Sequence, residues 1–155
     1  MEDDIKYMQM ALAEARKAYQ RAEVPIGAVV VCNDQVVGRG FNLREQTQDP
    51  TSHAEMIALR EAAANEDSWR LEDCQLYVTL EPCPMCAGAI LQSRIKRLVY
   101  GASDPKAGAV RSLYQLLDDN RFNHQVEEVE AGVLQKESAQ LLKDFFRELR
   151  QRKDG

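Results

Sequence analysis

The sequence predicts an α/β protein with a mixed β-sheet that is covered by helices on both faces. Short segments rich in β-branched residues alternate along the chain with segments whose apolar residues recur every three to four positions, which is typical of amphipathic helices. No internal repeat, low-complexity tract or linker interrupts this alternation. The 155 residues, 45% of them hydrophobic, suffice for one well-buried domain and are too few for two ordinary ones, so we expect a single domain over residues 1–155.

The chain opens with a predicted helix and a predicted hairpin. Apolar residues recur at helical spacing from Ile5 to Tyr19, and Pro25 lies beyond the end of this helix. Residues 26–32 and 35–37 are rich in β-branched side chains. The intervening Asn33-Asp34 consists of residue types that tolerate the positive φ of a tight turn, so a β-hairpin is expected.

The middle of the chain carries a loop, two helices and a strand. Residues 41–52 are mostly polar and lack periodicity, which indicates a loop. A helix is predicted from residue 53 to about residue 65, followed by a short strand over residues 75–80. Pro84 suits the first turn of a further helix, because its missing amide hydrogen costs nothing there.

The last third is predicted to add two strands and a long helix. Residues 97–100 and 125–129 have the composition of strands, with a loop over 101–108 and a short helix over 112–117 between them. Apolar residues between positions 134 and 149 form one stripe of the final helix.

Charge and cysteine content restrict the class of protein. The formal net charge of −5 argues against a broad basic surface that coats nucleic acid, although residues 134–155 carry six Lys or Arg against four acids. This basic end could meet phosphates, and a solvated helix face is its default interpretation. The chain start has no signal-peptide pattern, and no apolar run approaches a membrane span, so we expect a cytoplasmic protein. In a reducing cytosol, Cys32 and Cys74 are expected to be core thiols.

Three residues form a candidate metal site. His53 precedes Cys83 by 30 positions, and Cys86 follows in a C-x-x-C pattern. Each half is weak alone, since a lone His often caps a helix and a lone C-x-x-C can be a redox pair. Together they supply three ligands that can hold zinc and leave its fourth position to water, as hydrolytic zinc sites do. Iron or cobalt could occupy similar ligands.

Glu55 is the candidate catalytic carboxylate. On a helix it points well away from His53, so it cannot easily ligate the same ion, but it can lie beside the water. A capping carboxylate is the alternative interpretation. A closed structural site would require a fourth ligand, for which His124 and Cys74 are candidates, with Cys32 more remote.

The H-x-E pattern followed by P-C-x-x-C is the signature of zinc nucleobase deaminases. Beyond it, five segments between Val24 and Arg150 resemble the bacterial tRNA-specific adenosine deaminase family. These segments are VPIGAVV, DPTSHAEMIALR, LYVTLEPCPMCAGAILQSRI, VYGASDPKAGA and LLKDFFRELR. The resemblance implies a cytidine deaminase-like, three-layer α/β/α fold with a mixed five-stranded sheet. It also implies a homodimer with active sites near the subunit interface, and hydrolysis of the wobble adenosine of a tRNA anticodon to inosine.

The resemblance also assigns roles to individual residues. His53, Cys83 and Cys86 would bind one Zn²⁺ per subunit, Glu55 would shuttle protons to and from a zinc-activated water, and Asn42 would hydrogen-bond the purine. Contacts with the anticodon stem-loop are expected from the residues of one loop and the last helix: Asp104, Lys106, Phe145, Phe146 and Arg147. Both phenylalanines also fall on the apolar stripe, so at least one is expected in the core. Arg111 and residues 118–121 match the family poorly.

Two other functions remain open at this point. A free guanine, cytosine or cytidine deaminase would share the chemistry and need a closed pocket without an RNA surface; the basic final helix and the Lys106 loop argue against it. A catalytically silent zinc protein that binds RNA would have no use for Glu55 beside the ion.

Overall fold

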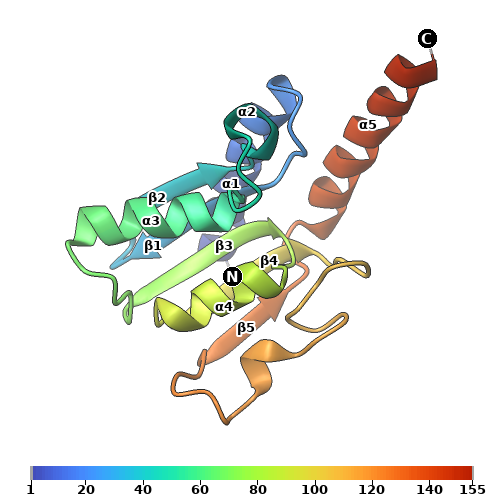
Figure 1. Ribbon diagram of the computed structural model, residues 1–155. Coiled ribbons are helices and arrows are strands. Elements are labelled where there is room, and N and C mark those ends of the chain that lie inside the picture. The colour runs from blue at the N-terminus through green and yellow to red at the C-terminus, as the bar shows by residue number, and fades with distance from the viewer. Residues whose placement is uncertain (1, 155) are drawn as a thin grey trace.

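The computed structural model describes residues 2–154 and contains a five-stranded mixed sheet with the strand order β2-β1-β3-β4-β5 (Figure 1). The strands are β1 (Gly27–Cys32), β2 (Gln35–Phe41), β3 (Cys74–Leu80), β4 (Arg97–Ala102) and β5 (Glu128–Ala131). Strand β1 is antiparallel to β2 and β3, whereas β3, β4 and β5 are parallel. The hairpin between β1 and β2 turns at Asn33 and Asp34, both with positive φ, as their residue types predict.

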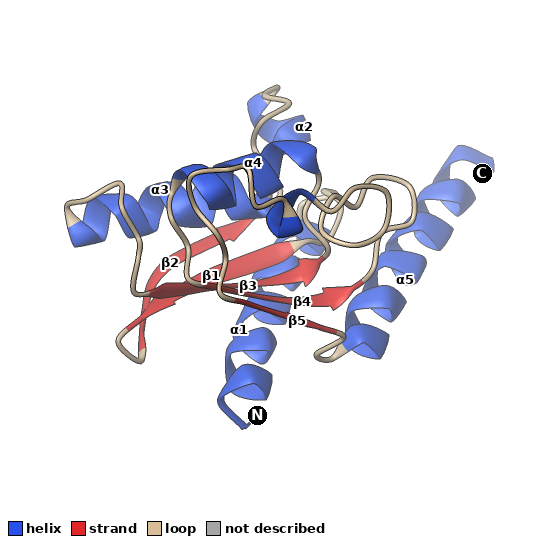
Figure 2. Cartoon of the chain, turned by 90° about the horizontal axis from the view of Figure 1, so that it is seen from below, coloured by secondary structure: helices blue, strands red, loops and turns tan. Residues whose placement is uncertain are grey.

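Helices cover both faces of this sheet, which confirms the predicted three-layer α/β/α fold (Figure 2). The helices are α1 (Glu2–Gln20), α2 (Arg44–Thr47), α3 (Ala54–Glu66), α4 (Pro84–Gln92) and α5 (Gln135–Asp154), with a 3-10 turn over Leu116–Asp118. Helices α3 and α4 lie on one face, and α1 and α5 lie on the other. Within the described residues, no helix is both long and apolar enough to cross a membrane.

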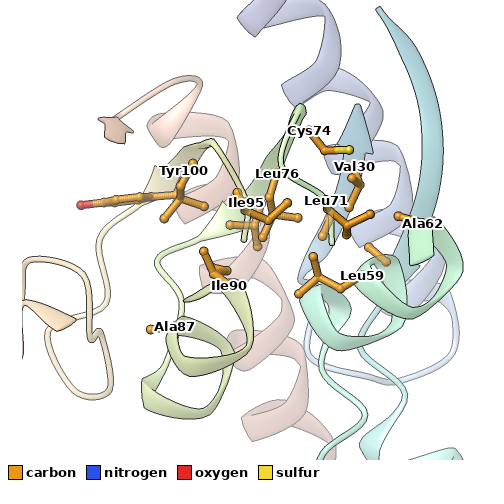
Figure 3. Close-up of a cluster of buried hydrophobic side chains, with 14 of the residues drawn as sticks. Val30, Leu59, Ala62, Leu71, Cys74, Leu76, Ala87, Ile90, Ile95 and Tyr100 are labelled. Atoms are coloured by element: carbon orange, nitrogen blue, oxygen red, sulfur yellow. The ribbon is translucent and has the colours of Figure 1, made fainter. Parts of the chain in front are cut away.

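The larger hydrophobic core lies between the sheet and the α3–α4 layer. Side chains from the strands, such as Val30 and Leu76, meet Leu59 of α3 and Ile90 of α4 there (Figure 3). A smaller cluster under α1 contains Met8 and strand residues from the opposite face. Because both faces of β1 and β3 are buried, these strands are apolar at nearly every position, and the helices on them are held at fixed positions.

Strand β2 extends four residues beyond the predicted segment, and two glycines explain the difference. A Cβ at Gly38 would lie 2.2 Å from the carbonyl oxygen of Ala58, and one at Gly40 would lie 2.3 Å from that of Ala54. Glycine is therefore required for α3 to pack directly on β2. The prediction ended at residue 37 because the β-branched residues end there.

Three further expectations are corrected by the structure. The helix predicted over 112–117 is absent, and this part of the chain forms turns with one 3-10 turn. Strand β5 begins three residues later than predicted, and the loop over 41–52 contains helix α2. Propensity alone misplaces such short elements because long-range hydrogen bonds hold them.

Cys32 and Cys74 are joined in a disulfide rather than being separate core thiols. They face each other directly across the antiparallel pair of β1 and β3, with their Cα atoms 4.3 Å apart. The 42-residue separation hides this pairing in the sequence. The bond lies at the end of β1 opposite to Gly27.

Candidate active site

The two halves of the predicted metal site lie at the starts of two neighbouring helices. His53 is the residue before α3, with extended backbone angles, and its carbonyl accepts the amide of Ile57. Cys83 occupies the same position before α4, with Pro84 as the first helical residue, as predicted. Cys86 follows within the first turn of α4 and is fully buried. The C-x-x-C spacing thus places both sulfur atoms beside the positive end of a helix dipole.

The three side chains converge. One nitrogen or sulfur atom from each of His53, Cys83 and Cys86 lies within 4.8 Å of the others. The Nδ1 atom of His53 is 3.6 Å from the sulfur of Cys83 and 3.5 Å from that of Cys86. Ligands at usual zinc–sulfur and zinc–nitrogen distances around a tetrahedral ion are about 3.6 Å apart. The donor set and its spacing therefore fit a zinc ion.

The two thiols share one proton unequally. A hydrogen bond from Cys86 is the main cause that lowers the pKa of Cys83 to about 4, against the opposing effect of burial. The same hydrogen bond, together with burial, raises the pKa of Cys86 far above its usual value. Cys83 is therefore a thiolate at neutral pH, which is the form that ligates a metal.

Glu55 is buried beside this group without belonging to it. Its side chain is on the first turn of α3 and lines the cavity described below. Burial raises the pKa of Glu55 to about 7, the nearby Cys83 sulfur adds to this, and His53 opposes it. A carboxyl group with a pKa near the working pH can both accept and release a proton.

A cavity of about 490 Å³ opens next to His53, Glu55 and Cys83. This volume falls in the range of small-molecule sites. Its walls come from six parts of the chain, and the lining residues are Val24, Ile26, Asn42, Arg44, His53, Ala54, Glu55, Leu80, Glu81, Cys83, Ser103, Asp104, Pro105, Lys106, Ala107, Leu142 and Phe146. The arrangement leaves space for a planar base beside the metal ligands.

Asn42 lies on the wall formed by the start of the 42–52 segment. It is buried, donates a hydrogen bond to the carbonyl of Val24, and accepts one from the amide of Arg44. An amide group can make four hydrogen bonds, so one donor and one acceptor position remain for a ligand. The sequence analysis missed Glu23, whose buried carboxylate accepts the amides of Glu45 and Gln46 and so holds α2 behind this wall.

The opposite wall is the loop that follows β4. Asp104 and Lys106 both line the cavity, and the Asp104 carboxylate accepts the amide of Lys106. The sequence analysis also missed Glu81, a buried residue that accepts hydrogen bonds from this loop. Burial alone would raise the pKa of Glu81, but these hydrogen bonds lower it to about 2. The sequence contained one sign of this role: Glu81 is a charged residue directly after an apolar strand, and it lies within the LEPC part of a segment that resembles the family.

Helix α5 places its two phenylalanines differently. Phe145 is buried, packs edge-on against Tyr19, and does not line the cavity. Phe146 is 41% exposed and lines the cavity, so the expectation that at least one of the two lies in the core is confirmed for Phe145, and the RNA contacts of both stay predictions. Arg147 is exposed on α5 outside the lining, where it pairs with Asp144.

The candidates for a fourth protein ligand lie elsewhere. A ring nitrogen of His124 is 2.7 Å from the carbonyl oxygen of Ile95, and Cys74 is bonded to Cys32. Among residues 2–154, the metal-ligating group contains no fourth His, Cys, Asp or Glu. An open position toward the cavity is typical of catalytic rather than structural zinc sites.

Comparison with known proteins agrees with this geometry and defines the class. The sequence model of the MafB19-like deaminase family matches residues 2–150, so the fold and the site are those of a deaminase.

Within that class, the chain belongs to the tRNA-specific adenosine deaminase family. It is 52% identical to the tRNA-specific adenosine deaminase of Bacillus subtilis over 153 residues, which are 99% of this chain and 94% of that protein. A solved structure from a study of A-to-I editing by tRNA:A34 deaminases superposes with a TM-score of 0.84 and 45% identity, covering 88% of this chain and 99% of that one. A guanine deaminase structure from Bacillus subtilis is 36% identical, with a TM-score of 0.61 and 63% coverage of each chain.

Proposed function

We propose that this protein converts the wobble adenosine of a tRNA anticodon to inosine by hydrolytic deamination. The observation that carries the proposal is the convergence of His53, Cys83 and Cys86 at a cavity that also holds the buried Glu55. Near-complete coverage of tRNA-specific relatives at about half identity supports adenosine in tRNA as the substrate. One deaminase domain over residues 1–155 accounts for the whole reaction.

The residues that would hold a zinc ion are His53, Cys83 and Cys86, whose 3.5 and 3.6 Å separations fit the tetrahedral arrangement. When bound there, zinc would supply a Lewis acid that lowers the pKa of a water molecule from about 15.7 to about 7. Cys83 is already favoured as a thiolate, and binding of the dication would displace the proton that Cys86 retains.

Glu55 moves the protons of the reaction. It takes one proton from the attacking water and delivers it to N1 of the adenine, while the water oxygen bonds to C6. It then transfers the second water proton to the amino nitrogen, the C6–N6 bond breaks, and ammonia leaves. The products are inosine and ammonia, and water is the sole co-substrate. Burial keeps bulk solvent from competing for these protons.

The cavity walls bind and orient the nucleotide in this proposal. Asn42 hydrogen-bonds the purine through its remaining donor and acceptor positions. Asp104 and Lys106 on one wall, and Phe146 and Arg147 on α5, contact the anticodon loop around the flipped base. Phe146 offers an exposed ring for base stacking, whereas Arg147 and Lys106 offer cations for phosphates.

A free-base deaminase is the alternative that the guanine deaminase similarity favours. Its coverage of 63% is lower than the 88% found for the tRNA:A34 deaminase structure. The basic α5 at the cavity rim also suits a polyanionic substrate better than a free base.

The direct test incubates the purified protein with an anticodon stem-loop carrying a wobble adenosine and measures inosine. Parallel reactions contain a chelator, or free adenine, guanine and cytosine with ammonia as the readout. The proposal expects inosine with the stem-loop, none with chelator, and no ammonia from free bases. Ammonia from a free base without inosine from the stem-loop would overturn it.

We further propose a cytoplasmic homodimer with tRNA as its partner. Trp69 is 58% exposed at the rim of an apolar groove that also includes the half-buried Met56, and two copies could bury these two side chains. Light scattering after size-exclusion chromatography measures the mass; a monomer at micromolar concentration would contradict the dimer.

A further inference from the structure

We infer that Glu81 is a positioning residue for the reaction, which holds the substrate-facing wall of the cavity in place. This inference rests on the proposed function, because the wall is assigned there to the anticodon loop. Glu81 itself leaves the chemistry to Glu55 and the metal ligands. It acts through the loop of residues 103–112.

The hydrogen bonds of Glu81 reach both ends of this loop. One carboxylate oxygen accepts the amide of Asp104 at 3.0 Å and the hydroxyl of Ser112. The other oxygen accepts the amides of Val110, Arg111 and Ser112 at 3.1, 2.9 and 3.0 Å. Five donors therefore converge on one carboxylate, which offers about four lone-pair sites and so has its hydrogen-bonding capacity filled. These hydrogen bonds hold both ends of the loop around the Glu81 side chain.

The backbone is shaped to admit the carboxylate. A Cβ at Gly108 would lie 2.4 Å from the carboxyl carbon of Glu81, so any other residue there would push the loop outward. The amide of Gly108 bonds to the carbonyl of Asp104, and the amide of Ala109 bonds to the carbonyl of Pro82. Glycine at position 108 is thus explained by the approach of Glu81.

The position of Glu81 couples this wall to the metal ligands. It follows β3 directly and precedes Cys83 by two residues, and its amide bonds to the carbonyl of Ala102 at the end of β4. Residues 103–107 line the cavity, while their anchor is 2% exposed. The segment from Glu81 to Cys83 therefore connects the metal-ligand side of the cavity to the loop that carries Lys106. The distance between these two sides of the cavity depends on this connection.

The test uses Glu81→Gln, with Glu14→Gln as the matched control. Glu14 is an equally buried glutamate on α1 that bonds to Lys17 and lies outside the cavity lining. A glutamine at position 81 retains the shape but turns an amino group toward N–H donors. We expect KM for the wobble-adenosine stem-loop to rise about tenfold, with a smaller change in kcat and unchanged zinc content. Glu14→Gln should leave KM at the parent value.

A double-mutant cycle separates positioning from general damage. Lys106→Ala should weaken binding of the stem-loop in the parent but add little in the Glu81→Gln background, because the wall that carries Lys106 is already displaced. Arg147→Ala, on α5, should weaken stem-loop binding by the same factor in the parent and in Glu81→Gln. Additive effects of Glu81→Gln and Lys106→Ala would overturn the inference, and so would loss of zinc from Glu81→Gln.

Two further measurements keep the inference testable if Glu81→Gln folds poorly or if the substrate differs. Ser112→Ala and Gly108→Ala alter the same contacts from the loop side and should raise KM in the same direction. Hydrogen exchange without substrate should show faster exchange of the amides of residues 104 and 110–112 in Glu81→Gln than in Glu14→Gln. Unchanged exchange overturns the inference, whereas failure of the parent to make inosine overturns the proposed function alone.

Discussion

The two walls of the cavity are held in different ways. The metal-ligand wall contains His53, Glu55 and Cys83 and lies at the starts of α3 and α4, where the helix backbone places these side chains. The substrate wall, formed by residues 103–107 and α5, is placed by side-chain contacts between distant parts of the chain. The candidate catalytic residues are thus placed by the starts of helices, whereas residues 103–107 of the opposite wall lie on irregular backbone.

Loss of a metal ligand is expected to have the largest effect. His53→Ala should remove zinc and reduce inosine formation to background, because two thiolates alone hold the ion poorly. Zinc content by mass spectrometry and stem-loop turnover measure this. The matched control is His124→Ala, since the only other histidine bonds to a backbone carbonyl. A His53→Ala protein that still binds zinc and still forms inosine would show that His53 is not a required metal ligand.

The second largest effect is expected from Glu55→Gln, which keeps the shape and removes the proton acceptor. We expect kcat to fall by about 100- to 10,000-fold while zinc content and stem-loop affinity persist. Single-turnover kinetics with the stem-loop measure the chemical step, and Glu14→Gln again serves as the control. Turnover within a few-fold of the parent would show that the proton passes through another group.

Neighbouring phenylalanines of α5 sharpen the comparison within one helix. Phe145→Ala should lower the free energy of unfolding by about 3 kcal/mol, because its ring is buried against Tyr19. Phe146→Ala should leave that free energy nearly unchanged and raise the Kd for the stem-loop about tenfold, because a stacking surface is lost. Chemical denaturation and fluorescence titration measure the two quantities. If Phe145→Ala weakened stem-loop binding and Phe146→Ala lowered the free energy of unfolding, Phe145 rather than Phe146 would be the residue that contacts the substrate.

The smallest effect is expected from Lys106→Ala. It should weaken stem-loop binding a few-fold and reduce the slope of log affinity against log salt by about 0.7 to 1, as loss of one phosphate contact does. The control is Lys96→Ala, since that lysine precedes β4 at the opposite end of the strand. Equal salt slopes for Lys106→Ala and the parent would remove Lys106 from the RNA contacts.

The same contrast explains what the sequence could predict. The grouping of His53, Cys83 and Cys86 could be predicted because each half of it is local, and helix geometry converts spacing into direction. The layers of the fold followed from apolar periodicity, and the structure confirms them. Both signals are short-range, so a single sequence carries them.

Long-range contacts are the reason for the errors. The end of β2 was misplaced at Gly38 and Gly40, whose role depends on α3 packing above them. The helix predicted over 112–117 is absent, and the amides of Arg111 and Ser112 bond to Glu81, some 30 positions earlier, a contact that local propensity does not reveal. Phe145 and Phe146 were indistinguishable because the side of α5 that faces Tyr19 is decided by packing.

The close packing of α3 on β2 has a consequence for how this protein can vary. At positions 38 and 40 a single methyl group would clash with the backbone of α3, the helix that carries Glu55 in its first turn. Saturation mutagenesis should therefore find almost no tolerated substitution at these two sites, although neither lines the cavity. Exposed residues of the opposite wall, such as Lys106 and Phe146, should tolerate more substitutions than a position where one added carbon meets the backbone of the helix that carries Glu55.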